Sequence, residues 1–352
     1  MKIIHTSDLH IGSPLTSRLG QREAQIRRRE LLTTLDEIIA AARREGAEAI
    51  IIAGDLFDSE RVTKSAKSRV YDSVKRASDI TFIYVAGNHE GDTVARDKTP
   101  ENLIILSGDG WSYHTTGGVT FAGTSRLGAG TFDGYCPSEG INIAVLHGEL
   151  RAGGEGSVSP KEAASHSLDY IALGHYHTYS SVRIDERCCA VYSGAPHGRG
   201  FDEAGVLGYV VIDTDEKPIS HRFVPLGTRR IHIKEVDATG ALGTLDIESR
   251  IEKAAADVRR DDLLRVVLTG DRSIDYTPDT AAIYDRFVNN YFYFEIKDET
   301  KVKIDVEELM YNKTLKGEFI RLVMSDGGLS DTEKGKIIDF GLRALMGDTP
   351  DE

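Results

Sequence analysis

Five apolar segments of this chain each run directly into polar residues of the types that bind metal ions. The segments cover residues 2–6, 48–53, 80–86, 141–146 and 169–173. Amphipathic helical patterns at 23–45 and 62–77 separate the first three segments, so strand and helix alternate. This alternation predicts an α/β fold with partly parallel sheets. In open sheets of this kind the ligand site lies beyond the carboxyl ends of the strands, where these polar residues would gather.

The polar residues at the strand ends are histidines, aspartates and one asparagine. In chain order they are Asp8, His10, Asp55, Asp58, Asn88, His89, His147, His175 and His177. One such residue alone would indicate little, because aspartate and asparagine are common in turns and most single histidines are structural. Five coincidences of position and residue type predict one shared site. Glycines that permit tight turns and close approach of the backbone stand beside them at positions 54, 87, 148 and 174.

The chemistry of this set points to metal ions rather than to a single catalytic side chain. Histidine nitrogens and carboxylate oxygens without thiolates favour a borderline-to-hard divalent ion such as Mn²⁺, and they also suit Fe²⁺ or Zn²⁺. Seven or eight ligands are too many for one ion and fit two ions that share a carboxylate. Paired ions about 3.5–4 Å apart clamp a phosphoryl group and generate hydroxide from bound water. The pattern therefore predicts a two-metal phosphoesterase.

Charge, cysteine content and the lengths of the apolar segments indicate which partners and which cellular compartment this chain suits. The net charge of −13 over 352 residues argues against a protein that grips nucleic acid over its whole surface. Two basic segments, 18–29 and 61–76, follow metal-type motifs and can be read equally as solvated helix faces or as phosphate contacts. The start of the chain lacks the apolar region of a signal peptide, the apolar stretches are too short to cross a bilayer, and the three cysteines form no framework. We therefore expect a cytoplasmic protein without a membrane role.

The pattern changes near PLGTRR at 225–230. Before it, further strands are predicted at 118–123, 188–192 and 205–213. After it, strands alternate with two charged helices, which is enough for a small α+β domain at 229–300. The remaining residues, 301–352, contain two amphipathic helical patterns split by SDGGLSD. Such a tail either packs on its own domain or binds a partner helix.

The ordered motifs DLH, GDLFD, GNHE, HG and GHYH resemble those of the calcineurin-like metallophosphoesterases. DLHIG together with AGDLFD looks like the SbcD-type DNA repair nuclease branch of that superfamily. The resemblance implies two mixed β-sheets sandwiched between helices in a catalytic domain at 1–228. It also implies a DNA-binding role for the cap at 229–300 and a partner-docking role for the helical tail at 301–352.

The resemblance also implies a role for each strand-end residue. The first metal would be held by Asp8, His10 and His177. The second metal would be held by Asn88, His147 and His175. Asp55 would bridge the two ions, and His89 would contact the phosphate and protonate the leaving oxygen.

The same resemblance also bears on Asp58, Glu90 and the segment around Arg199. Asp58 stands where archaeal and eukaryotic relatives commonly carry a histidine, and Glu90 replaces the more usual aspartate after GNH. SGAPHGRGFDE, at 193–203, resembles a glycine-rich segment that closes the catalytic domain. Asp58 and Arg199 are therefore expected to contact substrate, although a loop with no such contact is an equal reading for the segment around Arg199.

The function expected from this sequence is a manganese-dependent DNA nuclease in which a hydroxide that bridges two metals attacks the phosphodiester. Exonuclease and endonuclease cleavage both stay open. The expected partners are DNA and an SMC-like coiled-coil ATPase of the SbcC kind, and a homodimer is compatible with this function. A second reading is hydrolysis of a small phosphoester or a phosphoprotein, which the acidic charge fits slightly better. A third is an inactive scaffold, but scaffolds typically lose ligands, and none is missing here.

Overall fold

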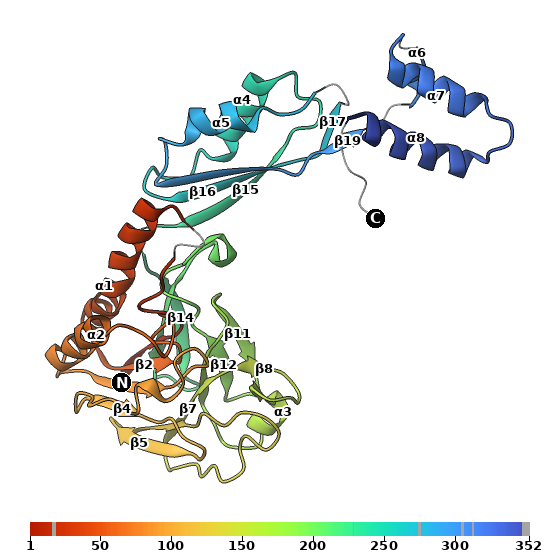
Figure 1. Cartoon of the computed structure of the whole chain (residues 1–352). Coiled ribbons are helices and arrows are strands. Elements are labelled where there is room, and N and C mark those ends of the chain that lie inside the picture. Colours follow the sequence, from red (N-terminus) through yellow and green to blue (C-terminus); the bar gives the residue numbers. More distant parts are fainter. Residues whose placement is uncertain (16–18, 228, 274–275, 304–305, 312, 347–352) are drawn as a thin grey trace. The chain divides into compact units, whose positions relative to one another are not determined.

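The computed structural model describes residues 1–15, 19–227, 229–273, 276–303, 306–311 and 313–346. Parts of three predicted features lie outside the described residues: Arg18 of the basic segment, residue 228 at the expected domain boundary, and residues 347–352 of the expected tail. Contacts divide the chain into two compact units (Figure 1). The first unit comprises Met1–His232 and Arg259–Leu263, and the second comprises Ile233–Val258 and Leu264–Glu352. The division into domains at 228 and 300 stays a prediction.

The first unit contains two six-stranded sheets. The first sheet has the order β14-β13-β1-β2-β3-β4, from β1 (Lys2–Thr6), β2 (Ala47–Ala53), β3 (Thr81–Val85), β4 (Leu103–Ile105), β13 (Gly208–Asp213) and β14 (Ser220–Pro225). Strands β1 to β4 are parallel, whereas β13 and β14 pair antiparallel. A parallel run of this kind places the ends of β1, β2 and β3 at one edge of the sheet.

The second sheet is also mixed. Its order is β11-β12-β10-β7-β6-β5, from β5 (Ser112–Thr116), β6 (Val119–Gly123), β7 (Ile141–His147), β10 (Tyr170–Gly174), β11 (Ser180–Arg183) and β12 (Cys189–Tyr192). The four central strands are parallel, and β5 and β11 close the edges as antiparallel strands. The ends of β7 and β10 therefore also meet at one edge.

Alternating side chains of the central strands build the layers of this unit. In β1, Ile4 packs toward α1 (Gln21–Glu45) and α2 (Lys64–Arg76), which cover the first sheet (Figure 1). The preceding residue, Ile3, points to the opposite face and packs between the two sheets against residues of the second sheet. A third cluster covers the far face of the second sheet with loops and the short α3 (Pro160–Ala163). The expected α/β fold with two mixed sheets between helical layers is confirmed.

The second unit is α+β with a separate helical part. Its sheet has the order β15-β16-β18, from β15 (Ile231–Asp237), β16 (Leu263–Thr269) and β18 (Tyr293–Asp298), and it packs with α4 (Thr244–Ala254) and α5 (Thr280–Phe287). Three helices, α6 (Val306–Tyr311), α7 (Leu315–Ser325) and α8 (Asp331–Met346), have a small core of their own. Short pairs complete the chain: β8 (Glu149–Leu150) with β9 (Ser157–Val158), and β17 (Asp271–Ser273) with β19 (Lys301–Lys303). Among the described residues, none of the helices has the length and hydropathy that a bilayer crossing requires.

Candidate metal centre

The loops that follow five strands of the first unit bring the predicted polar residues together. The first sheet contributes residues after β1, β2 and β3, and the second sheet contributes residues at the ends of β7 and β10. Three sets of side chains have ligand atoms within 4.8 Å of one another. The sets are Asp8, His10 and His177; Asp8, Asp55 and His147; and His10, Asp58 and His89.

The first set points two imidazoles and a carboxylate at one spot. The Nε2 atom of His10 lies 3.3 Å from Nε2 of His177, which lies 3.7 Å from Oδ1 of Asp8. Both His10 and Asp8 are buried, so water has little access to their ligand atoms. Lone pairs that converge in this way repel one another unless a cation lies among them. The donor set thus fits one divalent ion.

A second group of donors surrounds His147. Its Nδ1–H donates to the carbonyl of Ala53 at 2.9 Å, which orients the ring so that Nε2 is the nitrogen directed at the other candidate ligands. That Nε2 lies 2.9 Å from Oδ1 of Asn88 and 3.4 Å from Oδ2 of Asp55. The ring of His175 lies 5.5 Å from the His147 ring, between centroids, so it flanks this group without entering the tight sets above.

The Asp55 carboxylate lies between the two groups. Its Oδ2 is 3.7 Å from Nε2 of His10 and 3.4 Å from Nε2 of His147. Burial opposes its charge, but hydrogen bonds and attraction from His147 and His10 outweigh burial and lower the pKa of Asp55 to about 2. Burial likewise opposes the charge of His147, yet Asp55 and Asp8 raise the pKa of His147 to about 9. Asp55 therefore stays ionised, and in the absence of a metal its charge is balanced by protonated His147.

The backbone around the ligands is strained in a consistent way. Asp8, His10, Asp55 and His175 have φ of 54°, 45°, 49° and 103°, a region that residues other than glycine rarely adopt. Each such residue costs about 1–3 kcal/mol and persists only where the surrounding fold imposes it. A Cβ on Gly54 would overlap the His147 ring, and one on Gly87 would overlap the Asp55 carboxylate. The strand ends thus fix the ligand positions through the main chain.

His89 stands at the rim of the centre. Its side chain is 42% exposed, and its Nδ1–H donates to the carbonyl of Asp58 at 3.1 Å. Its main-chain N–H donates to Oδ1 of Asp55 at 3.1 Å, and its Nε2 lies 4.0 Å from Oδ2 of the same residue. His89 thus presents Nε2 beside the centre while solvent still reaches it.

Two further carboxylates, Glu90 and Glu203, support the centre, and no sequence motif indicated a role for Glu203. The Glu90 carboxylate is fully buried and accepts hydrogen bonds from the main chain of Leu56 and Phe57 and from the Tyr84 hydroxyl. Burial outweighs these bonds and raises the pKa of Glu90 to about 7. Glu203 accepts a hydrogen bond from Nδ1 of His177 at 2.9 Å. The local sequence around Glu203, GFDE, does not indicate this contact, because only folding brings Glu203 and His177 together.

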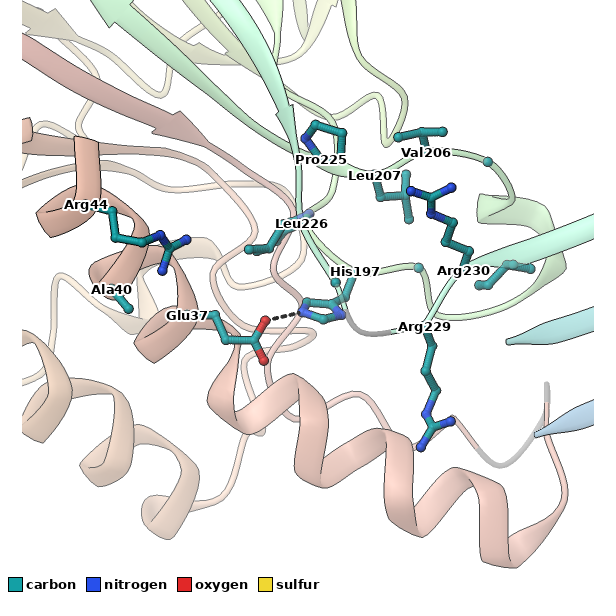
Figure 2. A pocket seen from close by; sticks show the side chains of 15 residues that line it. Glu37, Ala40, Arg44, His197, Val206, Leu207, Pro225, Leu226, Arg229 and Arg230 are labelled. Carbon is teal, nitrogen blue, oxygen red and sulfur yellow. Dashed lines mark hydrogen bonds and ion pairs between the residues drawn. The ribbon is translucent and has the colours of Figure 1, made fainter. Parts of the chain in front are cut away.

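Two residues of the segment at 193–203, Arg199 and His197, contact different parts of the first unit. Arg199 and Asp58 contact each other at 2.9 Å beside His10, and their expected contact with substrate stays a prediction. His197, in contrast, pairs with Glu37 of α1 at 3.0 Å (Figure 2). It lines a cavity of about 420 Å³ whose described lining includes Arg44 and Leu226 but none of the predicted metal ligands. His197 thus lines a cavity separate from the candidate metal centre.

Sequence comparisons with known proteins agree with this geometry. The family described as calcineurin-like phosphoesterase matches residues 1–179. The chain is 28% identical over 274 residues to the SbcD component of the SbcCD nuclease of Bacillus subtilis (strain 168), covering 62% of this chain and 67% of that protein. It is 24% identical over 387 aligned residues to the DNA double-strand break repair protein Mre11 of Sulfurisphaera tokodaii, covering 97% and 93%. A solved dimetal phosphatase from Danio rerio also aligns, with a TM-score of 0.40 at 12% identity, covering 64% of this chain and 99% of that one.

Proposed function

The chain belongs to the calcineurin-like phosphoesterase family and is a metal-dependent phosphodiesterase, and on this premise we propose that it is a DNA nuclease of the SbcD type that acts in DNA repair. The observation that carries the proposal is the Asp55 carboxylate, which lies between His10 and His147 as a ligand shared by two ions would. The names of the relatives, a component of a nuclease and a double-strand break repair protein, favour DNA as the substrate.

The residues of the centre divide into two ligand sets that share Asp55. One ion would be held by Asp8, His10 and His177, and the other by Asn88, His147 and His175. When bound, two divalent ions neutralise phosphate charge and activate water for attack on phosphorus. The nitrogen and oxygen donors without thiolate favour Mn²⁺, and Fe²⁺ or Zn²⁺ also suit them.

His89 is the proton donor in this proposal. The Asp58 carbonyl fixes the proton on Nδ1 and thereby orients the ring, so that Nε2 would face a phosphate bound at the centre. Protonated Nε2 would first contact a phosphate oxygen and then deliver its proton to the leaving sugar oxygen. Its main-chain N–H also orients Asp55, which links the donor to the shared ligand.

Exposed arginines on α1 support contact with DNA phosphates. Arg22, Arg28 and Arg29 are exposed and have no acidic partner among the described residues. Bases of α2 support it less, because Lys67 pairs with Asp97 at 2.8 Å. The DNA-binding role of the α+β part of the second unit stays a prediction, as do the cytoplasmic location and the homodimer.

The helical tail is the proposed docking site for a coiled-coil ATPase of the SbcC kind. Its three helices already bury a core of their own, yet they expose further large apolar side chains. The exposed fractions are 87% for Tyr311, 69% for Leu322 and 61% for Phe340. Apolar side chains on adjacent helices offer the kind of surface that another apolar helix covers.

The central test is degradation of DNA by the full chain. We expect Mn²⁺-stimulated degradation of linear duplex or single-stranded DNA, and its loss in Asp55→Asn. The matched control Asp109→Asn, at an exposed position, should keep wild-type activity. DNA that stays intact under all metal conditions would count against the proposal.

Hydrolysis of a small phosphoester or a phosphoprotein is the second candidate. The net charge of −13 favours it, because an acidic surface repels the DNA backbone. The full chain separates the two candidates by its kcat/KM for DNA and for bis(p-nitrophenyl) phosphate. A nuclease should prefer DNA, and DNA should inhibit its hydrolysis of the small ester. A small-molecule enzyme should show neither effect.

A further inference from the structure

A buried arginine joins two carboxylates beside the candidate metal centre. Nη1 of Arg199 donates to Oδ1 of Asp58 at 2.9 Å. On its other side, Nε donates to Oε1 of Glu203 at 2.9 Å, Nη2 lies 2.7 Å from the same oxygen, and the Arg199 main-chain N–H donates to Oε2 at 2.7 Å. Charge-assisted bonds with several donors fix a carboxylate in orientation as well as in position.

Each of the two carboxylates faces the back of a different histidine. Oε1 of Glu203 accepts from Nδ1 of His177 at 2.9 Å. Oδ1 of Asp58 lies 3.3 Å from Nδ1 of His10, although the contact is not a well-formed hydrogen bond. The Nε2 atoms of the same two histidines are the ones that approach each other to 3.3 Å. Glu203 therefore holds the His177 ring, and Asp58 lies behind the His10 ring, each on the side opposite the convergence point.

Burial separates this arrangement from an ordinary surface ion pair. The side chains of Arg199 and Glu203 are 8% and 3% exposed, and that of His10 is not exposed at all, whereas Asp58 and His177 at the ends of the network are 20% and 24% exposed. A buried charge network persists when every member is paired, and removal of one member leaves the others uncompensated. Since all three guanidinium nitrogens of Arg199 face these acids, little of the group is left for a phosphate.

We propose that Arg199 is a positioning residue that, by holding Asp58 and Glu203, aims the imidazoles of His10 and His177 at a single metal ion. The inference rests on the proposed function, in which these two histidines share the first ion. Carboxylates behind metal-binding histidines fix the ring orientation and commonly change metal affinity by about 10–100-fold. Arg199 adds a link that makes the two histidines move as one unit.

Calorimetric titration of the full chain with Mn²⁺ tests the proposal. We expect wild type to bind two ions, and Arg199→Met and Arg199→Lys to bind one of them about 10–100-fold more weakly while keeping the other. Lysine keeps the charge but loses the fork that spans two acids, so it should not restore affinity. Arg187→Met, which breaks an arginine–carboxylate pair with Asp169 elsewhere in the first unit, should leave both affinities unchanged.

Kinetics distinguishes positioning from contact with substrate. If Arg199 positions ligands, raising Mn²⁺ should restore kcat in Arg199→Lys with KM unchanged. If it contacts phosphate instead, KM should rise at every Mn²⁺ concentration with wild-type metal affinity, which would overturn the proposal. Glu203→Gln keeps an acceptor for His177, so we expect its affinity for the same ion to fall by less than in the Arg199 variants. Wild-type Mn²⁺ affinity in both Glu203→Gln and Arg199→Lys would also overturn the proposal. A wild-type chain that binds no metal would instead defeat the proposed function itself.

Discussion

At the scale of single residues, proton competition at His147 should govern metal loading. Without metal, the raised pKa of about 9 means that His147 carries a proton at neutral pH, held by Asp55 and Asp8. A metal can bind Nε2 only after that proton leaves. The affinity for Mn²⁺ should therefore rise as pH rises, on the order of tenfold per unit below the pKa. Titration calorimetry between about pH 6 and pH 8 measures the slope, and buffers of different ionisation enthalpy count the protons released.

The control for this prediction is His147→Asn, which has no proton to lose. Its affinity should be weaker and should depend less on pH. A wild-type affinity that stays constant over this range would show that His147 is neutral before metal arrives.

His89 should affect turnover without affecting metal binding. The side chain lies at the rim, and its Nε2 is 4.0 Å from Asp55, farther than the Nε2 atoms of His10 and His147. Loss of a general acid typically costs about 10²- to 10⁴-fold in rate. We expect His89→Gln to lower kcat on this scale while Mn²⁺ titrations match wild type. A lost ion in that titration would make His89 a ligand instead.

The residues of the centre differ in how far a sequence can reveal them. Asp8, Asp55 and His147 could be grouped beforehand, because each follows an apolar strand and strand ends meet at a sheet edge. Glu203 could not, since its contact with His177 joins a loop to a strand end that share no pattern. The metal-binding roles of all these residues stay predictions until metal is titrated.

At the scale of elements, Glu90 ties the loops after β2 and β3 together. Its carboxylate accepts from Leu56 and Phe57 in one loop and from Gly87 in its own. A glutamine would place an N–H₂ group against one of these donors and leave a buried N–H unpaired, which costs about 1–3 kcal/mol. We expect Glu90→Gln to unfold at lower urea concentration and to bind Mn²⁺ more weakly. The control Glu101→Gln, at an exposed position, should change neither; equal values in both variants would contradict the role of Glu90.

The elements that sequence patterns predicted are the buried ones. Continuous apolar runs indicated β1, β2 and β7, and the helix periodicity indicated α1 within two residues of its start. Edge strands were missed, because β5 alternates between half-buried and exposed residues and β11 is exposed throughout. Such strands are defined by their pairing with a neighbour, which a local pattern does not contain.

At the scale of the whole molecule, hydrolysis and partner docking should be separable. Leu322 of α7 and Phe340 of α8 are exposed, whereas the core of the tail uses Ile320 and Ile338. The double variant Leu322→Glu/Phe340→Glu should therefore fold and keep its hydrolysis of bis(p-nitrophenyl) phosphate. Its affinity for a purified SbcC-type ATPase should fall by about tenfold or more, as expected when central apolar contacts of an interface are lost. Light scattering after size exclusion measures the complex.

The matched control changes another exposed apolar pair. Leu242 and Leu245 are 96% and 81% exposed in the α+β part of the second unit. Leu242→Glu/Leu245→Glu should leave the complex intact. Equal loss in both double variants would point to charge rather than to the tail surface.

The origin of the ligands in both sheets has a further consequence for the life of the protein in a cell. Ions held by residues from each sheet would fasten the two layers to each other, and a ligand present at about a thousandfold above its Kd adds roughly 4 kcal/mol to stability. A chelator should then lower the melting temperature and speed digestion by a protease that needs no metal ion. Scarcity of metal would thus reduce the abundance of the enzyme through turnover, in addition to silencing it.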